Sequence, residues 1–183
     1  HIGPSGLVAR KMNWMAPHAL QVLGSPEHGL FFWTTVAVLA LAGLAALAVR
    51  GGDTRRVAGC LLLMVAAQVY AAGSVESWTV AGAFGQRRFV GLTAVLVIGL
   101  AALSGAARSR LGRAALVGTV LVCVWWNLGL MVQFGAGLMD RQRLEPTRNA
   151  YTTFVTLPRQ VPALARRFLV DRASFYEPPQ TGP

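Results

Sequence analysis

Four long runs of apolar residues alternate with short polar segments along this chain, at about residues 30–49, 57–73, 89–105 and 114–138. Each run approaches the ~20 residues that a helix needs to cross the hydrocarbon core of a membrane. No Asp, Glu, Lys or Arg lies near the middle of any run. The pattern therefore predicts an all-α integral membrane protein with about four transmembrane helices.

The segments outside these runs have patterns of their own. We expect the short apolar stretch Ala19–Leu23 to form an interfacial helix, and Ser25-Pro26-Glu27 has the residue types of a helix start. At 157–172, apolar residues recur at helical spacing among arginines, which predicts an amphipathic helix lying in the membrane interface. We accordingly divide the chain into a membrane domain, 1–138, and a C-terminal part, 139–183, that holds the interfacial helix and a loose tail.

The balance of charge fits a membrane protein. The chain carries 17 Lys and Arg against 7 Asp and Glu, a net charge of +10, yet only 13% of its residues are charged, against about 25% in soluble domains. The arginines gather in short polar segments, where they suit anionic headgroups better than a nucleic acid, so no nucleic-acid partner is expected. Arg50–Arg56 and Arg108–Arg113 hold three arginines each, with one acid in total. The positive-inside rule places both in the cytoplasm, and the remaining polar segments on the outer face.

The apolar runs offer little chemistry. Cys60 and Cys123 lie in different runs without metal-binding spacing, so neither a disulfide, a metal site nor a cofactor is expected. The lack of an ionisable residue at mid-span argues against an ion-coupled transporter. Asn127 and Gln133 are the strongly polar residues deep in the last run, and we expect them to hydrogen-bond across helices.

The candidate site is the polar, glycine-containing stretch Ser77–Phe89 between the second and third runs. The adjacent guanidinium groups of Arg87 and Arg88 can hold a phosphate through paired hydrogen bonds at a membrane surface. Glycines let the backbone turn tightly toward a ligand, and aromatic rings form an apolar or sugar-stacking wall. The residues concerned are Gly82, Gly85, Trp78, Phe84 and Phe89. The stretch suits a lipid-linked phosphate, although arginines directed to headgroups beside an interfacial aromatic belt would give the same pattern.

His28 lies just before the first run, beside the expected helix start. An imidazole in that position can act as a ligand or an acid–base group, or it can be an ordinary interfacial side chain. The other histidines, His1 and His18, also lie outside the runs, so a haem ligated inside the membrane by this chain is not expected.

Two segments resemble motifs of a known class of membrane enzymes. The segment at 78–89 reads Trp-x-x-x-Gly-x-Phe-Gly-Gln-Arg-Arg-Phe, and the segment at 25–34 reads Ser-Pro-Glu-His-Gly-Leu-Phe-Phe-Trp-Thr. Both are similar to segments near the C-terminus of bacterial polytopic glycosyltransferases of the GT-C class, which resemble the dolichyl-phosphate-mannose–protein mannosyltransferases. The likeness covers roughly Trp14–Leu103. Ala83 and Thr35 depart from the serine and proline that are usual in that class.

The resemblance implies inverting sugar transfer from a polyprenyl-phosphate donor at the outer face of a bacterial cytoplasmic membrane. The arginine pair would hold the donor phosphate, and the site would be lined by His28, Trp78, Phe84 and Gly85. The class places its catalytic acidic residue in the first outer loop, upstream of the likeness, and this sequence has no such loop. We therefore expect the chain to be the C-terminal portion of a longer protein, not catalytic alone, and leave open whether it is an enzyme.

An alternative interpretation is a non-catalytic accessory or scaffold subunit of a larger respiratory or photosynthetic membrane complex. The missing catalytic loop and the lack of cofactor ligands in the apolar runs favour it. A third interpretation is a lipid-binding module. The partners expected are membrane lipids, a polyprenyl-phosphate lipid and other membrane subunits.

Overall fold

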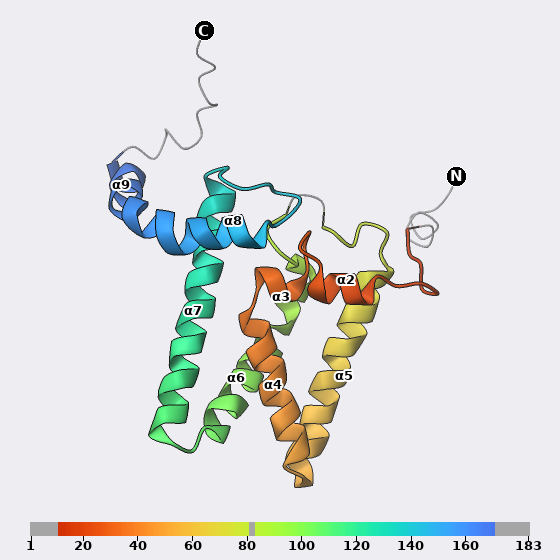
Figure 1. The fold of residues 1–183 in the computed structure, drawn as a ribbon. Helices are drawn as coiled ribbons and strands as arrows, with labels where there is room; N and C mark the ends of the chain where they lie inside the picture. Colours follow the sequence, from red (N-terminus) through yellow and green to blue (C-terminus); the bar gives the residue numbers. More distant parts are fainter. Residues whose placement is uncertain (1–10, 81–82, 171–183) are drawn as a thin grey trace, which may run out of the picture.

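The computed structural model describes residues 11–80 and 83–170, and all of their regular elements are helical (Figure 1). This confirms the all-α prediction for the described residues. The elements in chain order are α2 (Ala19–Gly24), α3 (Leu30–Trp33), α4 (Val36–Val49), α5 (Gly52–Ser74), the 3₁₀ helix η1 (Arg87–Leu92), α6 (Thr93–Ala106), α7 (Arg110–Gly135), α8 (Pro146–Tyr151), the π-helical turn η2 (Thr152–Thr156) and α9 (Leu157–Val170). Within this part of the chain, an isolated bridge between Met12 and Val75 is the only extended pairing.

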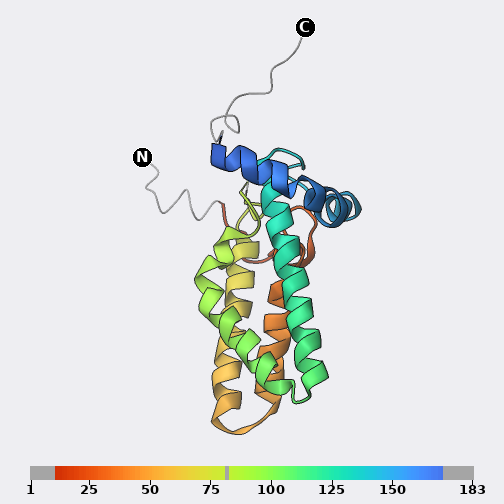
Figure 2. The same ribbon diagram turned by 90° about the vertical axis from the view of Figure 1, so that its left-hand side faces the viewer.

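Three helical segments are long and apolar enough to cross a membrane: Gly52–Ser74, Arg87–Ala106 and Arg110–Gly135. The first predicted run, 30–49, forms α3 and the shorter apolar helix α4. Figures 1 and 2 show α4, α5, α6 and α7 running up and down between two ends of the molecule. The turn end holds the connections α4–α5 and α6–α7. The cap end holds α2, the segments 75–80 and 83–86, α8 and α9.

The first apolar run is split because α3 and α4 meet at a break. Thr34 has φ −135° and ψ 66°, outside the helical region, which leaves the last carbonyls of α3 without helical partners. Two side chains from α7 supply those partners. The indole Nε1 of Trp126 donates to the carbonyl of Phe32 at 2.9 Å, and the amide of Asn127 donates to the carbonyl of Trp33. The prediction that Asn127 bonds across helices is thus confirmed.

Close backbone contact holds α4 against α6. A Cβ built at Gly99 would collide with the backbone oxygen of Ala40, and one built at Gly43 would collide with that of Gly99. These two glycines were not predicted from the sequence, because the apolar runs are rich in small residues throughout. Packing of this kind replaces the hydrophobic effect, which does not drive helices together within lipid.

The C-terminal helix begins earlier than predicted. Sequence pattern places its start near residue 157, whereas α8 starts at Pro146 and continues through η2 into α9. Proline suits the first helical turn because its missing N–H would have no partner there. This long bent helix lies across the cap-end tip of α7 (Figures 1 and 2). The predicted loose tail lies outside the described residues.

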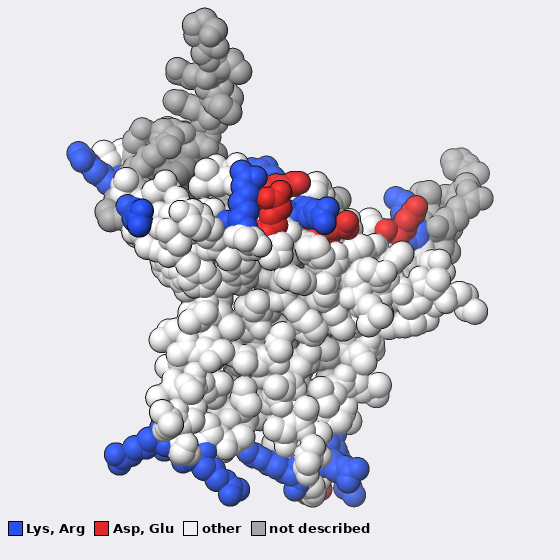
Figure 3. All heavy atoms as spheres, viewed as in Figure 1, with Lys and Arg blue, Asp and Glu red and all other residues white. Residues whose placement is uncertain are grey.

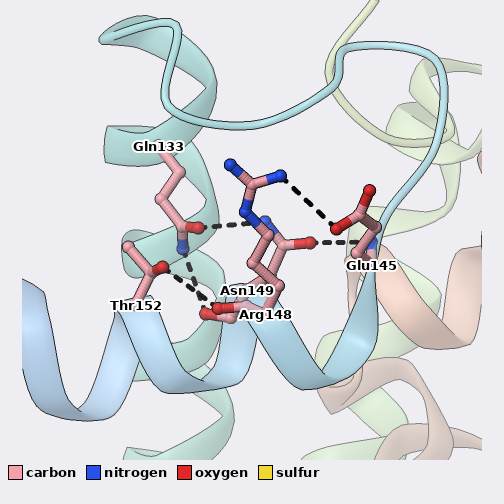
Figure 4. A network of polar contacts seen from close by, with 5 residues as sticks. All are labelled: Gln133, Glu145, Arg148, Asn149 and Thr152. Atoms are coloured by element: carbon pink, nitrogen blue, oxygen red, sulfur yellow. Dashed lines mark hydrogen bonds and ion pairs between the residues drawn. The ribbon is translucent and has the colours of Figure 1, made fainter.

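A buried polar network joins α7 to α8 (Figure 4). Gln133, with 0% of its surface exposed, donates to the hydroxyl of Thr153 at 2.8 Å and accepts from Asn149 Nδ2 at 2.9 Å. Asn149 Oδ1 in turn accepts from the backbone N–H of Glu145 at 2.7 Å. The prediction that Gln133 bonds across helices is confirmed, and these bonds fix the start of α8 against α7.

Two other predicted boundaries are shifted. Arg55 and Arg56, expected in a loop, lie in the first turns of α5, so that the α4–α5 connection is reduced to Arg50 and Gly51. Ser25 was expected to start a helix, but α3 begins at Leu30. The Ser25 hydroxyl accepts from the N–H of Glu27 at 3.2 Å, and this bond stabilises a single turn between α2 and α3. The short helix predicted at Ala19–Leu23 is confirmed as α2.

Candidate functional site

The two segments that carry the resemblance pack together at the cap end. The ring of Phe84 meets the ring of Trp33 edge-on, with centroids 5.3 Å apart. Gly85, buried and at φ +56°, lies so close that an added Cβ would be 3.4 Å from Cβ of Trp33. A positive φ favours glycine, which accounts for that residue at this position. Segments far apart in sequence therefore share one interface.

An aromatic cluster forms the centre of this interface, and its members come from three parts of the chain. Phe134, at the end of α7, lies 5.5 Å from Phe84 and 6.2 Å from Trp33 between ring centroids, in edge-on geometry. The guanidinium of Arg141 lies over the Phe134 ring, 5.3 Å from its centroid. Such a contact is attractive because the ring face is electron-rich. We call Trp33, Phe84, Phe134 and Arg141 the aromatic cluster.

Phe134 and Arg141 were not predicted from the sequence as part of this site. Phe134 has the hydropathy of any residue in the last apolar run, and Arg141 belongs to a segment with several other arginines. The link between them and the candidate site is tertiary. The backbone N–H of Leu144 donates to the carbonyl of Pro26 at 2.8 Å, which fastens the segment after α7 onto the segment that precedes α3.

His28 is completely buried beside this cluster, with its ring stacked on Trp33 at a centroid distance of 5.2 Å. Both ring nitrogens, Nδ1 and Nε2, lack a hydrogen-bond partner among the described residues. Burial lowers the pKa of His28, an effect that the nearby carboxylate of Glu27 opposes. The imidazole is therefore biased toward its neutral form, with one donor and one acceptor position unfilled.

The structure separates the two arginines that the sequence treats as a pair. The guanidinium of Arg88 is half-buried and donates to the carbonyl oxygens of Ser77 at 3.0 Å and Trp78 at 3.3 Å. It thereby ties the start of η1 to the backbone of Ser77 and Trp78. Arg87 is exposed, and no hydrogen bond or ion pair of its side chain is found within the described part of the chain. A ligand can approach Arg87 without displacing any of these bonds.

Trp78 lies apart from the aromatic cluster. Its ring stacks on His18 with centroids 5.8 Å apart, and it packs against the apolar core between α2, α5 and η1. Its backbone oxygen accepts from Gln86 Nε2 at 2.9 Å as well as from Arg88. The Oε1 atom of the buried Gln86 has no partner among the described residues. Trp78 thus packs against the apolar core, whereas Phe84 and Gly85 contact Trp33.

Metal-binding groups are sparse in the described residues. They contain no cluster of three or more His, Cys, Asp or Glu side chains that could hold a metal ion. Cys60 is exposed and Cys123 is half-buried, and both are free thiols. The polar groups of the cap end include guanidinium groups, one buried imidazole, amides and carboxylates such as those of Glu27 and Glu145.

Comparison of this chain with protein-family models, with curated proteins and with solved structures found no match.

Proposed function

We propose that this chain is the membrane-embedded portion of a GT-C-like glycosyltransferase, in which the cap end holds the phosphate of a polyprenyl-phosphate sugar donor. The observation that carries the proposal is the packing of the two resembling segments against each other through Trp33, Phe84 and Gly85. An exposed cation, Arg87, and a second cation on an aromatic ring, Arg141, lie at this same end. Guanidinium groups bind phosphate strongly, and an apolar wall suits a prenyl chain.

The proposal assigns different tasks to the residues predicted from sequence. Arg87 binds the phosphate, while Arg88 ties the start of η1 to the carbonyls of Ser77 and Trp78. Phe84 and Gly85 form the wall, and His28 offers its unfilled nitrogens to a polar group of the donor. The base that activates the acceptor belongs to the upstream loop which the resemblance implies, so the residues of this chain bind and orient the donor.

The topology of the proposal has four crossings. α3 and α4 together make the first, and the three long helical segments make the others. The cap end then faces the outside of a bacterial cytoplasmic membrane and the turn end faces the cytoplasm, as the arginine distribution favours. α8 and α9 lie in the outer interface, where the exposed Leu169 and Val170 reach apolar lipid.

Titration of the purified full chain with polyprenyl phosphate tests this function. We expect saturable binding that weakens about tenfold or more in Arg87→Ala and in Arg141→Ala, because each loses a charged hydrogen bond to the phosphate. Arg143→Ala is the matched control, since this exposed arginine lies in the same segment as Arg141 but makes no aromatic contact among the described residues. Equal binding by all four proteins would contradict the proposal.

A second candidate function, an accessory or scaffold subunit, is favoured by the exposure of α7. In the most apolar 18-residue stretch of α7, only 11% of the residues are buried within the chain, against 33% in the corresponding stretch of α5. In a membrane, either lipid or another subunit covers such a surface. Purification with further polypeptides at fixed stoichiometry would support this function, and a monodisperse single chain that binds polyprenyl phosphate would contradict it.

A further inference from the structure

A groove between α6 and α7 opens close to the turn end, far from the candidate site. Its volume is about 220 Å³, and its lining is apolar except for one hydroxyl; the lining residues are Leu100, Ser104, Leu116, Val117, Val120 and Leu121. Figure 1 shows the two helices joined by a short turn and leaning apart above it. The groove is thus a slot along two helices that faces the membrane.

The size of the groove limits what can occupy it. Pockets for drug-sized ligands measure ~300 Å³ or more, and a helix with its side chains is ~10 Å wide, so both are too large. A slender apolar object such as a segment of one acyl chain fits. The lining residues Val117 and Leu121 are 58% and 62% exposed, so lipid reaches the groove directly from the side.

The positive charge beside the groove indicates the kind of lipid headgroup that suits it. Arg108 lies on the turn that joins α6 to α7, and Arg110 and Arg113 lie at the start of α7. All three are exposed, and no acidic residue lies in this segment. Figure 3 shows basic side chains gathered at this end and a belt without charged residues above them. A guanidinium triad next to an apolar slot is complementary to a lipid with an anionic headgroup.

We propose that the groove is a specific binding site for an anionic phospholipid, with one acyl chain between α6 and α7 and the headgroup phosphate on the triad Arg108, Arg110 and Arg113. The site is independent of the donor site at the cap end. It holds the exposed half of α7 to α6, where direct packing between the two helices is slight. The lipid therefore acts as a structural ligand of the turn end.

The α4–α5 connection provides a matched control inside the same molecule. It carries Arg50, and Arg55 and Arg56 follow in the first turns of α5, so that three arginines again lie at the same end of the bundle. The guanidinium of Arg56 lies 3.6 Å from the carboxylate of Asp53, and both side chains are almost fully exposed. General attraction to an anionic membrane would treat the two triads alike, whereas a built site uses only the α6–α7 triad.

The test measures binding of dioleoyl-phosphatidylglycerol to the purified full chain, by native mass spectrometry and by the rise in thermal midpoint over phosphatidylcholine. Changing Arg108, Arg110 and Arg113 to Gln is expected to weaken binding by about fivefold per arginine, and the same change at Arg50, Arg55 and Arg56 to have little effect. Equal losses from the two triads would overturn the proposal, as would equal binding of phosphatidylcholine.

A second pair of variants tests the groove without changing charge. Val120→Phe fills the slot, whereas Val122→Phe places the same ring on an exposed part of α7 outside the lining. We expect Val120→Phe to lose the effect of phosphatidylglycerol while keeping the wild-type thermal midpoint in phosphatidylcholine, and Val122→Phe to behave as wild type. Retention of phosphatidylglycerol by Val120→Phe, or a second polypeptide found in the groove by crosslinking, would overturn the proposal.

Discussion

The two ends of this molecule are both rich in arginine, but they use it differently. At the turn end the arginines project outward, and the only internal partner found there in the described residues is the exposed carboxylate of Asp53 (Figure 3). At the cap end Arg88 binds two backbone carbonyls and Arg141 lies on an aromatic ring, next to a buried histidine. The first arrangement suits contact with lipid headgroups. The second is an organised polar structure, which is typical of a site that recognises a ligand.

The two ends are held in place by the close packing of α4 against α6. Gly99→Ala should disrupt this packing, and its effect should be the largest of those predicted here. The added methyl group meets the backbone of Ala40, which cannot move aside as a flexible side chain would. We expect a loss of about 3 kcal/mol in the free energy of unfolding. Gly105→Ala on the same helix is the control, because its new Cβ meets nothing within 4 Å. Comparable thermal midpoints for the two variants would show that α4 and α6 are not in close contact.

Asn149→Ala should disrupt the cap end and leave the turn end unchanged. Removal of the amide leaves Gln133 Oε1 and the N–H of Glu145 without these partners in a buried region. A loss of about 2 kcal/mol is expected, seen as faster proteolysis of the segment after α7. Thr152→Ala is the control, since its hydroxyl bonds only within its own helix, to the carbonyl of Arg148 at 3.0 Å (Figure 4). Equal resistance of the two variants to proteolysis would show that the polar network does not stabilise the segment after α7.

The pattern of apolar residues was sufficient to predict an all-α chain with helices apolar enough to cross a membrane, and the grouping of polar segments at two ends. It did not predict the break at Thr34, because that break depends on donors that Asn127 and Trp126 bring from α7. Nor did it distinguish Arg87 from Arg88, which are adjacent and chemically identical. Only the folded loop shows which one reaches the carbonyls of Ser77 and Trp78.

The candidate site could be predicted only in part, because several of its contacts are tertiary. Phe84 and Gly85 were recognised because their residue types stand out in a polar stretch. Phe134 and Arg141 lie far along the chain, and the contacts that bring them to Trp33 are tertiary. Local sequence carries no signal for such contacts, and a buried imidazole such as that of His28 looks like any interfacial histidine until the packing around it is known.

A smaller effect is expected in the pH dependence of stability, because the cap end contains the buried His28. Because burial lowers the native pKa of His28 below its ordinary value of 6.5, the unfolded chain binds more protons than the native one near that pH. Stability is fully present above pH 6.5 and decreases as the pH falls through that value toward the native pKa. The thermal midpoint should therefore be lower in mild acid, and His28→Gln should reduce this dependence. An unchanged pH profile in that variant would assign the dependence to other groups.

The most direct test of the central claim, that the cap end is the recognition site, locates a photoreactive polyprenyl phosphate on the full chain. A diazirine beside the phosphate would be activated with the lipid bound, and the labelled peptides would be identified by mass spectrometry. We predict adducts within 28–33 and 83–89, reduced in Arg87→Ala and unchanged in Arg143→Ala. Adducts confined to the groove between α6 and α7, or spread evenly over the apolar helices, would contradict the account.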